Sequence, residues 1–369
     1  GRLVPADRLL GRDAQRWLRR RRETLEAARP LVLSRGKISL VREFLLPAID
    51  WRAAVATDDA LFAAGYRDRE VVVVRVAWRR VLDPRFGPLV GPGASFFEEP
   101  AGTRWLVEPQ QTGEPLLLAA DPRGRAPTIV HVLGGEPLAH RKFAEGDRFA
   151  ADMLAGGHRS LSARSVGAAY ASDGALHAAD LASDGALTIN AYLSGNSQLL
   201  GLATFDLKKV FASGPLRFPM PLFVREDKLY AAIGLALWFV GPRRSMGMFP
   251  LPSAVTQVVG SAPSTPPRVA VAMQQGGVMF WGENPNAGRS AFASEMIEPR
   301  IALTRRGCLV AASKDEIDVY RTAEGQLQLS ARLPGNQSPP LAATLTSNAD
   351  QFAIIYPDGR VAIYRIDSH

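Results

Sequence analysis

The chain has 369 residues, of which 47% are hydrophobic and 22% charged, a composition that excludes a disordered polymer and fits a folded globular protein. The net charge is +8, and no apolar run approaches the ~18–20 residues that a membrane-spanning helix needs. A single cysteine, Cys308, excludes an intrachain disulfide, so we expect a cytoplasmic protein in which Cys308 is a buried apolar residue. The wealth of Ala, Arg and Gly is typical of a bacterial, high-GC genome.

The first 35 residues hold most of the positive charge. They contain ten arginines and four acidic residues, which gives +6 of the total +8, so the rest of the chain is nearly neutral. Asp7 or Asp13 can cap a helix there, and Pro30 marks its end. The apolar residues that fall near one face of this helix are Leu10, Ala14, Trp17, Leu18, Leu25 and Ala28. We therefore expect residues 1–36 to form a short basic amphipathic α-helix, or a linker from an upstream domain, ahead of a domain over residues 37–369.

Three roles remain open for this N-terminal segment. It packs on the main domain or ends a preceding one, it inserts its apolar face into a partner protein, or its arginines attract nucleic acid. Four consecutive arginines point around a helix instead of lining one stripe, which counts against nucleic acid. The candidate partner-binding residues in this segment are Trp17, Leu18, Arg19, Arg20, Arg21 and Arg22.

From residue 37 onward, the sequence predicts short strands joined by tight turns. Residues 37–45 alternate apolar and polar side chains, as a half-buried strand does. Two identical strings, Ala-Ser-Asp-Gly-Ala-Leu at 171–176 and 182–187, each place Asp-Gly at a hairpin turn and together predict a three-strand meander. Including this meander, strand groups are predicted near 60–78, 116–133, 164–193, 229–241, 268–282, 308–321 and 351–365.

Aromatic residues repeat at one position of the last four groups. Trp238, Trp281, Tyr320 and Tyr364 are separated by 43, 39 and 44 residues. A hairpin that recurs every 40-odd residues is typical of a β-propeller, in which each repeat is a four-stranded blade. We therefore predict an all-β, seven-bladed β-propeller, with six or eight blades as alternatives, and we expect the four aromatics to pack between blades. The less regular segments place Trp51, Trp78 and Trp105 where they can be exposed.

The last hairpin leaves few residues for an outermost strand. An unclosed ring would expose a sheet edge, so we expect residues 37–45 to pair with residues 361–366 and close the last blade. The basic helix would then lie beside this blade.

Residues 357–367 (PDGRVAIYRID) resemble the closing phrase of a WD40 blade, and residues 314–321 (KDEIDVYR) are similar without the glycine. This WD40-like or quinoprotein-like resemblance covers mainly the C-terminal half. The Gly-His and Trp-Asp dipeptides of WD40 blades are absent from these repeats, so the buried His–Asp network of that family is not expected. The resemblance implies a rigid platform for protein partners.

Catalytic and cofactor signatures are missing from the sequence. It contains no HExxH, CxxC or GxSxG motif, so we expect neither a metal nor a cofactor and name no catalytic residue. Glu98 and Glu99 form an acid pair in a loop flanked by Pro and Gly. They are the candidate channel acids of an alternative function, a propeller enzyme of hydrolase or lyase type, although a solvated loop explains them as well.

A second candidate partner-binding patch follows Pro242. Its residues are Arg243, Arg244, Met246, Met248 and Phe249. Arg, Met and Phe are enriched at protein interfaces, but the same stretch also fits a buried outer strand with a basic lead-in. Taken together, the sequence predicts a noncatalytic scaffold subunit whose partner is another protein or an upstream domain. A channel enzyme and electrostatic nucleic-acid binding are the alternatives.

Overall fold

The computed structural model describes an almost wholly β chain. It describes residues 36–67, 70–82, 97–98, 105–106, 116–119, 128–131, 164–170, 176–181, 186–192, 199–206, 220–225, 228–241, 246–260, 269–275, 277–281, 289–292, 296–305, 307–321, 326–333 and 338–368. Within these ranges the only helix is the four-residue α2 (Trp78–Val81). The all-β prediction is confirmed for this part of the chain, and the helix predicted within residues 1–36 lies outside it, except for Gly36.

The described strands form seven sheets, which we number in chain order from the first. Sheet 1 contains β2 (Asp50–Ala56), β3 (Ala60–Arg67), β4 (Glu70–Ala77) and β5 (Phe97–Glu98), with β6 (Trp105–Leu106) beside β4. Sheet 2 contains β7 (Leu116–Ala119) and β8 (Thr128–His131). Sheet 3 contains β9 (Arg164–Tyr170), β10 (Leu176–Leu181), β11 (Ala186–Tyr192) and β12 (Leu199–Asp206).

The remaining four sheets each have four antiparallel strands. Sheet 4 contains β13 (Leu222–Arg225), β14 (Lys228–Ile233), β15 (Ala236–Val240) and β16 (Met246–Pro250). Sheet 5 contains β17 (Val255–Gly260), β18 (Val269–Met273), β19 (Val278–Trp281) and β20 (Arg289–Phe292). Sheet 6 contains β21 (Arg300–Leu303), β22 (Cys308–Ala312), β23 (Glu316–Arg321) and β24 (Gln326–Arg332). Sheet 7 contains β25 (Ala342–Leu345), β26 (Gln351–Ile355), β27 (Arg360–Ser368) and β1 (Gly36–Leu45).

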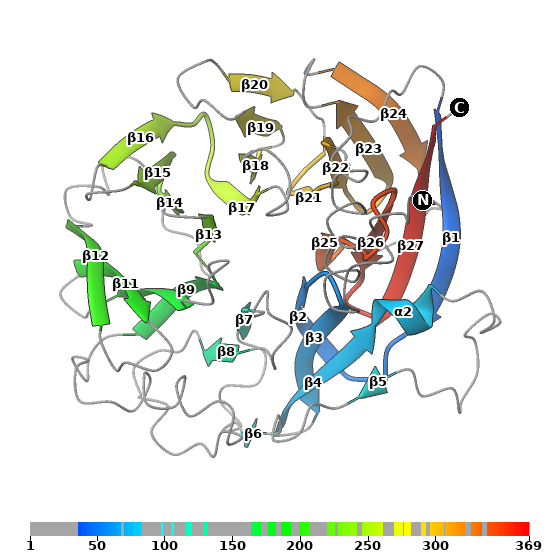
Figure 1. Ribbon diagram of the computed structural model, residues 1–369, viewed down its shortest axis with the longest axis horizontal. Helices are drawn as coiled ribbons and strands as arrows, with labels where there is room; N and C mark the ends of the chain where they lie inside the picture. The colour runs from blue at the N-terminus through cyan, green and yellow to red at the C-terminus, as the bar shows by residue number, and fades with distance from the viewer. Residues whose placement is uncertain are drawn as a thin grey trace, which may run out of the picture.

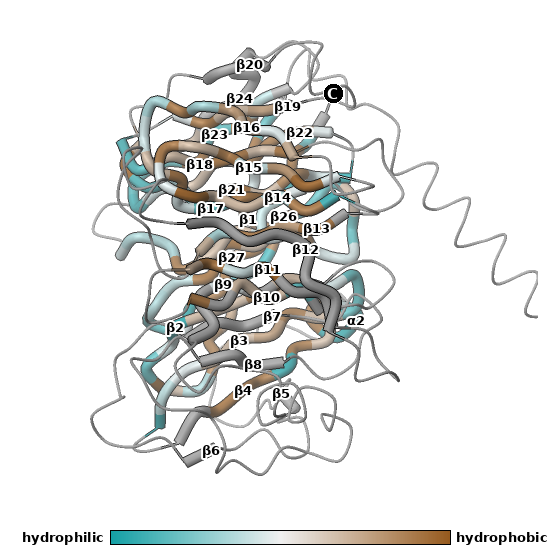
Figure 2. Tube along the Cα trace, turned by 90° about the vertical axis from the view of Figure 1, so that its left-hand side faces the viewer, coloured by the Kyte–Doolittle hydropathy of each residue, from teal (hydrophilic) through white to brown (hydrophobic). Residues whose placement is uncertain are grey.

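The sheets lie around a common centre, with their first strands innermost (Figure 1). Each of these inner strands contacts the inner strands of both neighbouring sheets, in the cyclic order β2, β7, β9, β13, β17, β21, β25 and back to β2. Viewed from the side, hydrophobic stretches run along the strands, and many of the turns that join them are hydrophilic (Figure 2). Buried apolar side chains of adjacent sheets pack together in shared clusters.

One inner contact is made by a polar side chain. In β17, the Gln257 amide donates from Nε2 to the carbonyl oxygen of Ile301 at 3.1 Å and accepts at Oε1 from the Ile301 N–H at 2.9 Å. A side-chain amide thus takes the place of a backbone peptide group and joins sheet 5 to β21 of sheet 6.

The two ends of the described chain meet in sheet 7. β1 pairs antiparallel with β27, from Gly36 opposite Ser368 to Leu45 opposite Arg360. The pairing shifts by one residue at Val41, a β-bulge that reverses which face the following residues occupy. Because of this shift, Ile38 packs against the cluster between sheets 6 and 7, whereas Phe44 joins the cluster between sheets 7 and 1.

Aromatic side chains fill the spaces between sheets. Tyr320 and Tyr364 are buried and Trp238 packs against the cluster between sheets 3 and 4, as predicted for the repeated position. The expectation of exposure was wrong for Trp51 and Trp78, which are both fully buried between sheets 7 and 1. Their burial is possible because each indole N–H finds a carbonyl acceptor at 3.1 Å, that of Pro47 for Trp51 and that of Thr57 for Trp78.

The side chains of Trp105 and Trp281 lie outside the described part of the structure. The prediction for Cys308 is confirmed, since this free cysteine is buried in β22. The apolar run at 229–240 forms two strands, β14 and β15, that supply buried residues to the clusters on both sides of sheet 4.

Candidate partner-binding surface

Strand β16 carries the most exposed apolar side chains among the candidate residues that the structure describes. Met246 is 47% exposed and Met248 is 49% exposed. β16 is the outermost strand of sheet 4 and pairs only with β15 within that sheet, with Met246 opposite Val240 and Met248 opposite Trp238. The two methionines therefore lie on one face of the strand, about 7 Å apart along it, since alternate residues of a strand point the same way.

The opposite face of β16 holds the strand in place. Phe249 stacks on Phe239 of β15, with ring centroids 5.3 Å apart. A Cβ atom at Gly247 would lie 2.1 Å from Cζ of Phe239, so only glycine lets this ring cover the strand. Gly247 and Phe249 thus pack β16 onto Phe239 of β15, and the two methionines lie on the other face of the strand.

Sequence analysis left two interpretations of this stretch open, a partner-binding patch and a buried outer strand, and each is correct in part. Residues 246–250 are an outer strand, and the Phe249 side chain is half-buried, yet both methionines face solvent. Arg243 and Arg244 lie outside the described residues, as do Trp17, Leu18 and Arg19 to Arg22 of the N-terminal segment.

Glu98, the first residue of the acid pair, does not lie near the inner strands. Glu98 lies in β5, at the outer edge of sheet 1 and three strands away from inner strand β2. Neither the Glu98 side chain nor Glu99 belongs to the described part. Among the described residues, no group of three or more His, Cys, Asp or Glu side chains is placed to hold a metal ion.

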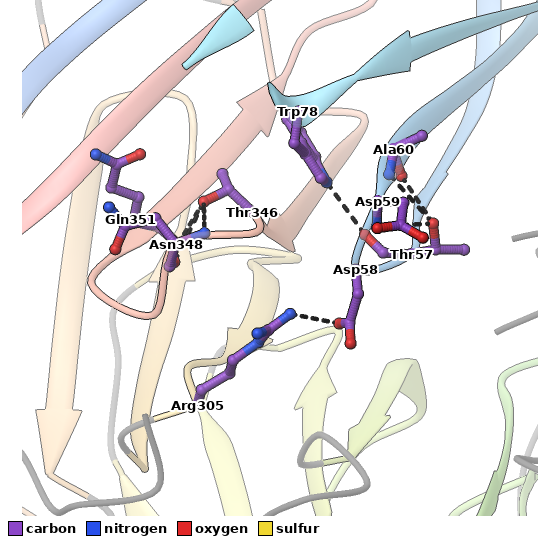
Figure 3. Close-up of polar contacts among 9 residues, drawn as sticks. All are labelled: Thr57, Asp58, Asp59, Ala60, Trp78, Arg305, Thr346, Asn348 and Gln351. Atoms are coloured by element: carbon purple, nitrogen blue, oxygen red, sulfur yellow. Dashed lines mark hydrogen bonds and ion pairs between the residues drawn. The ribbon is translucent and has the colours of Figure 1, made fainter. Parts of the chain in front are cut away.

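A polar cluster lies where the turns of three inner strands meet (Figure 3). Arg305, in the turn after β21, donates from Nη2 to Oδ1 of Asp58, in the turn after β2, at 2.6 Å. This ion pair links sheet 6 to sheet 1, past the inner turn of sheet 7 that carries Thr346 and Asn348. The Asp58 side chain is 69% exposed, so the pair forms part of a solvent-facing polar surface.

Three threonines build these turns. The hydroxyl oxygens of Thr57, Thr304 and Thr346 accept backbone N–H bonds from Ala60, Cys308 and Asn348, at 3.2, 2.9 and 3.1 Å. Each threonine directly follows an inner strand, and its hydroxyl oxygen accepts a backbone hydrogen bond within the turn. We did not predict these turns from the sequence, although a threonine directly after each of these inner strands was a usable signal.

Two buried tyrosines in sheet 7 have perturbed acidity. Burial raises the pKa of Tyr356 and of Tyr364 above the ordinary phenol value, because the charged phenolate is costly in an apolar site. The nearby Arg360 opposes this rise in pKa for both. Its guanidinium lies 4.0 Å from the centre of the Tyr356 ring and 3.5 Å from Oε2 of Glu43 in β1. Arg360 thus links β1 to the end of β26, and we assign these contacts a role in stability.

Within the described part of the chain, no helix is long and apolar enough to span a bilayer.

Comparison with known proteins identifies the fold. No family model matches the sequence, and no curated protein matches it. Among solved structures, the chain is similar to the Cps50 (Swd1) β-propeller domain of Myceliophteria thermophila, with a TM-score of 0.55 and 12% sequence identity over 90% of this chain and 99% of that one. At this identity the likeness establishes the fold alone. The propeller predicted from the hairpin spacing is therefore confirmed.

Proposed function

We propose that this chain is a noncatalytic interaction scaffold built on a seven-bladed propeller, and that β16 is part of its partner-binding surface. The seven described sheets and the cyclic contacts of their inner strands support the blade number. The observation that carries the function is the pair of half-exposed methionines, Met246 and Met248, on a strand packed onto Phe239 through Gly247 and Phe249.

Methionine suits such a role for a physical reason. Its unbranched, polarisable side chain adapts to the shape of a partner, and burial of apolar surface stabilises a complex. A strand already packed onto its own sheet loses less entropy on binding. Arg243 and Arg244 lie within three residues of Met246 in the sequence, so the proposed surface combines apolar and positively charged side chains and fits a partner segment that is apolar and acidic.

The domain organisation belongs to the same proposal. Residues 37–369 form the propeller and residues 1–36 a separate basic segment, whose arginines at 19–22 supply a second positively charged surface for an acidic partner. The partner is another protein or an upstream domain. The buried free thiol of Cys308 supports a reducing, cytoplasmic setting.

Affinity capture from native-host lysate tests this function. The bait pair is the wild-type chain and a Met246→Glu, Met248→Glu variant, which places two charges on the proposed surface. Ile297, which is 78% exposed ahead of β21, gives a matched control as Ile297→Glu. We expect at least one protein to bind the wild type and the control but to be lost from the β16 variant. Identical captures with all three baits would refute the assignment of β16.

A further inference from the structure

A second exposed apolar face lies on β1, the outer strand of sheet 7. Leu40 is 54% exposed and Leu45 is 57% exposed. They pair with Tyr364 and Arg360 of β27, and Glu43 between them pairs with Ala362. Directly paired residues point to the same side of an antiparallel sheet, so Leu40, Glu43 and Leu45 share the side of sheet 7 that faces sheet 6. We call these three residues the β1 face.

The bulge at Val41 creates this face. Without it, Leu40 and Phe44 would point to the same side, whereas the register shift sends Phe44 into the core between sheets 7 and 1. The same shift brings Leu45 to the side of Leu40. Leu40 and Leu45 are thereby left half-exposed on outer strand β1. Another apolar segment that covered them would remove their apolar surface from water.

We propose that the β1 face is the docking site for the chain's own N-terminal segment, which packs its apolar residues against Leu40 and Leu45 in cis. The segment runs directly into β1 at Gly36 and carries the apolar residues Leu10, Ala14, Trp17, Leu18, Leu25 and Ala28. Because the segment is covalently attached, its effective concentration at the β1 face is on the order of millimolar. A separate partner of equal affinity would need a higher concentration than this to displace it.

The dimensions agree with this occupant. The positions opposite Leu40 and Leu45 are four residues apart on β27, which is about 13 Å along the strand. Leu18 and Leu25 are seven residues apart, about 10 Å in a helix. The eight residues from Ala28 to Gly36 reach roughly 27 Å when extended, enough for a helix to reverse direction and run back along β1. A helix over residues 13–28 would be about 24 Å long and would cover both leucines.

The charges of the β1 face and of the N-terminal segment also support this occupant. Glu43 lies between the two leucines and its side chain is 42% exposed, although Arg360 lies within 3.5 Å on one side. The segment has ten arginines against four acidic residues, so arginines next to its apolar stripe meet a carboxylate at the centre of the face.

Limited trypsin digestion of the full chain tests the docking, because the segment contains its own cleavage sites at residues 19–22. The variant Leu40→Asp, Leu45→Asp removes the apolar contact, and Met246→Asp, Met248→Asp is the matched control on β16. We expect cleavage within residues 19–22 to be at least tenfold faster in the β1 variant than in the wild type and the control. Equal cleavage rates in all three proteins would overturn the proposal.

A second measurement covers the case in which the β1 variant fails to fold. A photo-crosslinking amino acid at position 40 or 45 of the otherwise unchanged chain reports which segment lies on the face. Crosslinks within one chain to residues 10–28 support the proposal. Crosslinks between two chains, or none to this segment, overturn it in favour of a second copy or an open face. Neither result alters the capture test at β16, so the two proposals fail separately.

Discussion

Methionine serves opposite purposes in the two middle strands of sheet 5 and in the outer strand of sheet 4. Met273 ends β18 and Met279 lies in β19, the two middle strands of sheet 5, and they are 4% and 5% exposed. Met246 and Met248, in outer strand β16, are 47% and 49% exposed. All five residues of β22 and of β26 are buried, whereas exposed and half-buried residues alternate along β16. An apolar side chain near the centre therefore stabilises the ring, and one at the rim is available for binding.

Geometry explains this difference. Sheets arranged around a centre converge at their inner strands and separate toward the rim, so an inner strand has a neighbour on both faces. An outer strand lies further from the neighbouring sheets and can expose one face, as β16 does, although outer strand β1 still contacts β24 of sheet 6. Four substitutions or conditions should test this division, from the largest expected effect to the smallest.

Removing an inner aromatic ring should have the largest effect. Phe352 in β26 is fully buried and stacks on Tyr364, with ring centroids 5.6 Å apart. Phe352→Ala should lower the free energy of unfolding by about 3–5 kcal/mol, because it leaves a cavity between sheets 6 and 7. Guanidinium-induced unfolding measures this change. The outer counterpart, Met248→Ala, should shift the free energy by less than about 0.5 kcal/mol. Similar losses for both variants would break the comparison.

Inner strands should also depend on polar contacts between sheets. Gln257→Leu removes both hydrogen bonds to the Ile301 peptide groups and should cost about 1–3 kcal/mol, since their partners lose their hydrogen bonds. Gln274, an exposed residue in the turn after β18, is the control as Gln274→Leu. Urea unfolding of the two variants should differ by at least about 1 kcal/mol. Equal stabilities would show that water replaces the Gln257 bridge.

Alkaline pH should weaken sheet 7. The folded protein holds the phenol protons of Tyr356 and Tyr364 more tightly than the unfolded chain does, because burial raises both pKa values. The corresponding stability is complete below about pH 10 and falls above it, by up to ~1.4 kcal/mol per pH unit for each tyrosine. Urea unfolding between pH 8 and pH 11 measures the slope. Tyr356→Phe keeps the ring beneath Arg360 and should reduce that slope, and an unchanged slope would contradict burial of the phenol as its cause.

The ion pair between turns should contribute least. Asp58→Asn breaks the pairing with Arg305 and should cost less than about 1 kcal/mol, since the Asp58 carboxylate is largely exposed. The difference from wild type should disappear in about 1 M salt, which screens exposed charges. Asp50→Asn, which breaks a pair with Arg52 on the same strand, is the control without an inter-sheet link. A cost well above about 1 kcal/mol for Asp58→Asn would make the turn cluster a main element of ring closure.

Much of the β-structure was predictable from local pattern. The meander expected over 164–193 appears as β9, β10 and β11, which together run from Arg164 to Tyr192. The elements that were not predicted include the inner strands β2, β17, β21 and β25, the outer strand β12 and the short helix α2. No Asp-Gly turn precedes β12, and α2 is a single turn whose Trp78 is fixed by a bond to the turn after β2. Both depend on neighbours that a local pattern does not contain.

The sequence by itself determined one hairpin in each sheet and the repeat that identifies a propeller. These features depend on alternation with a period of two and on turn residues, which act over a few positions. Only the tertiary structure decided that Trp51 and Trp78 are buried and that Met246 and Met248 are exposed. It also joined Arg305 to Asp58, 247 positions away in the sequence. Exposure depends on how far a strand lies from the ring centre and on which sheet covers it, and both are set by residues distant in the chain.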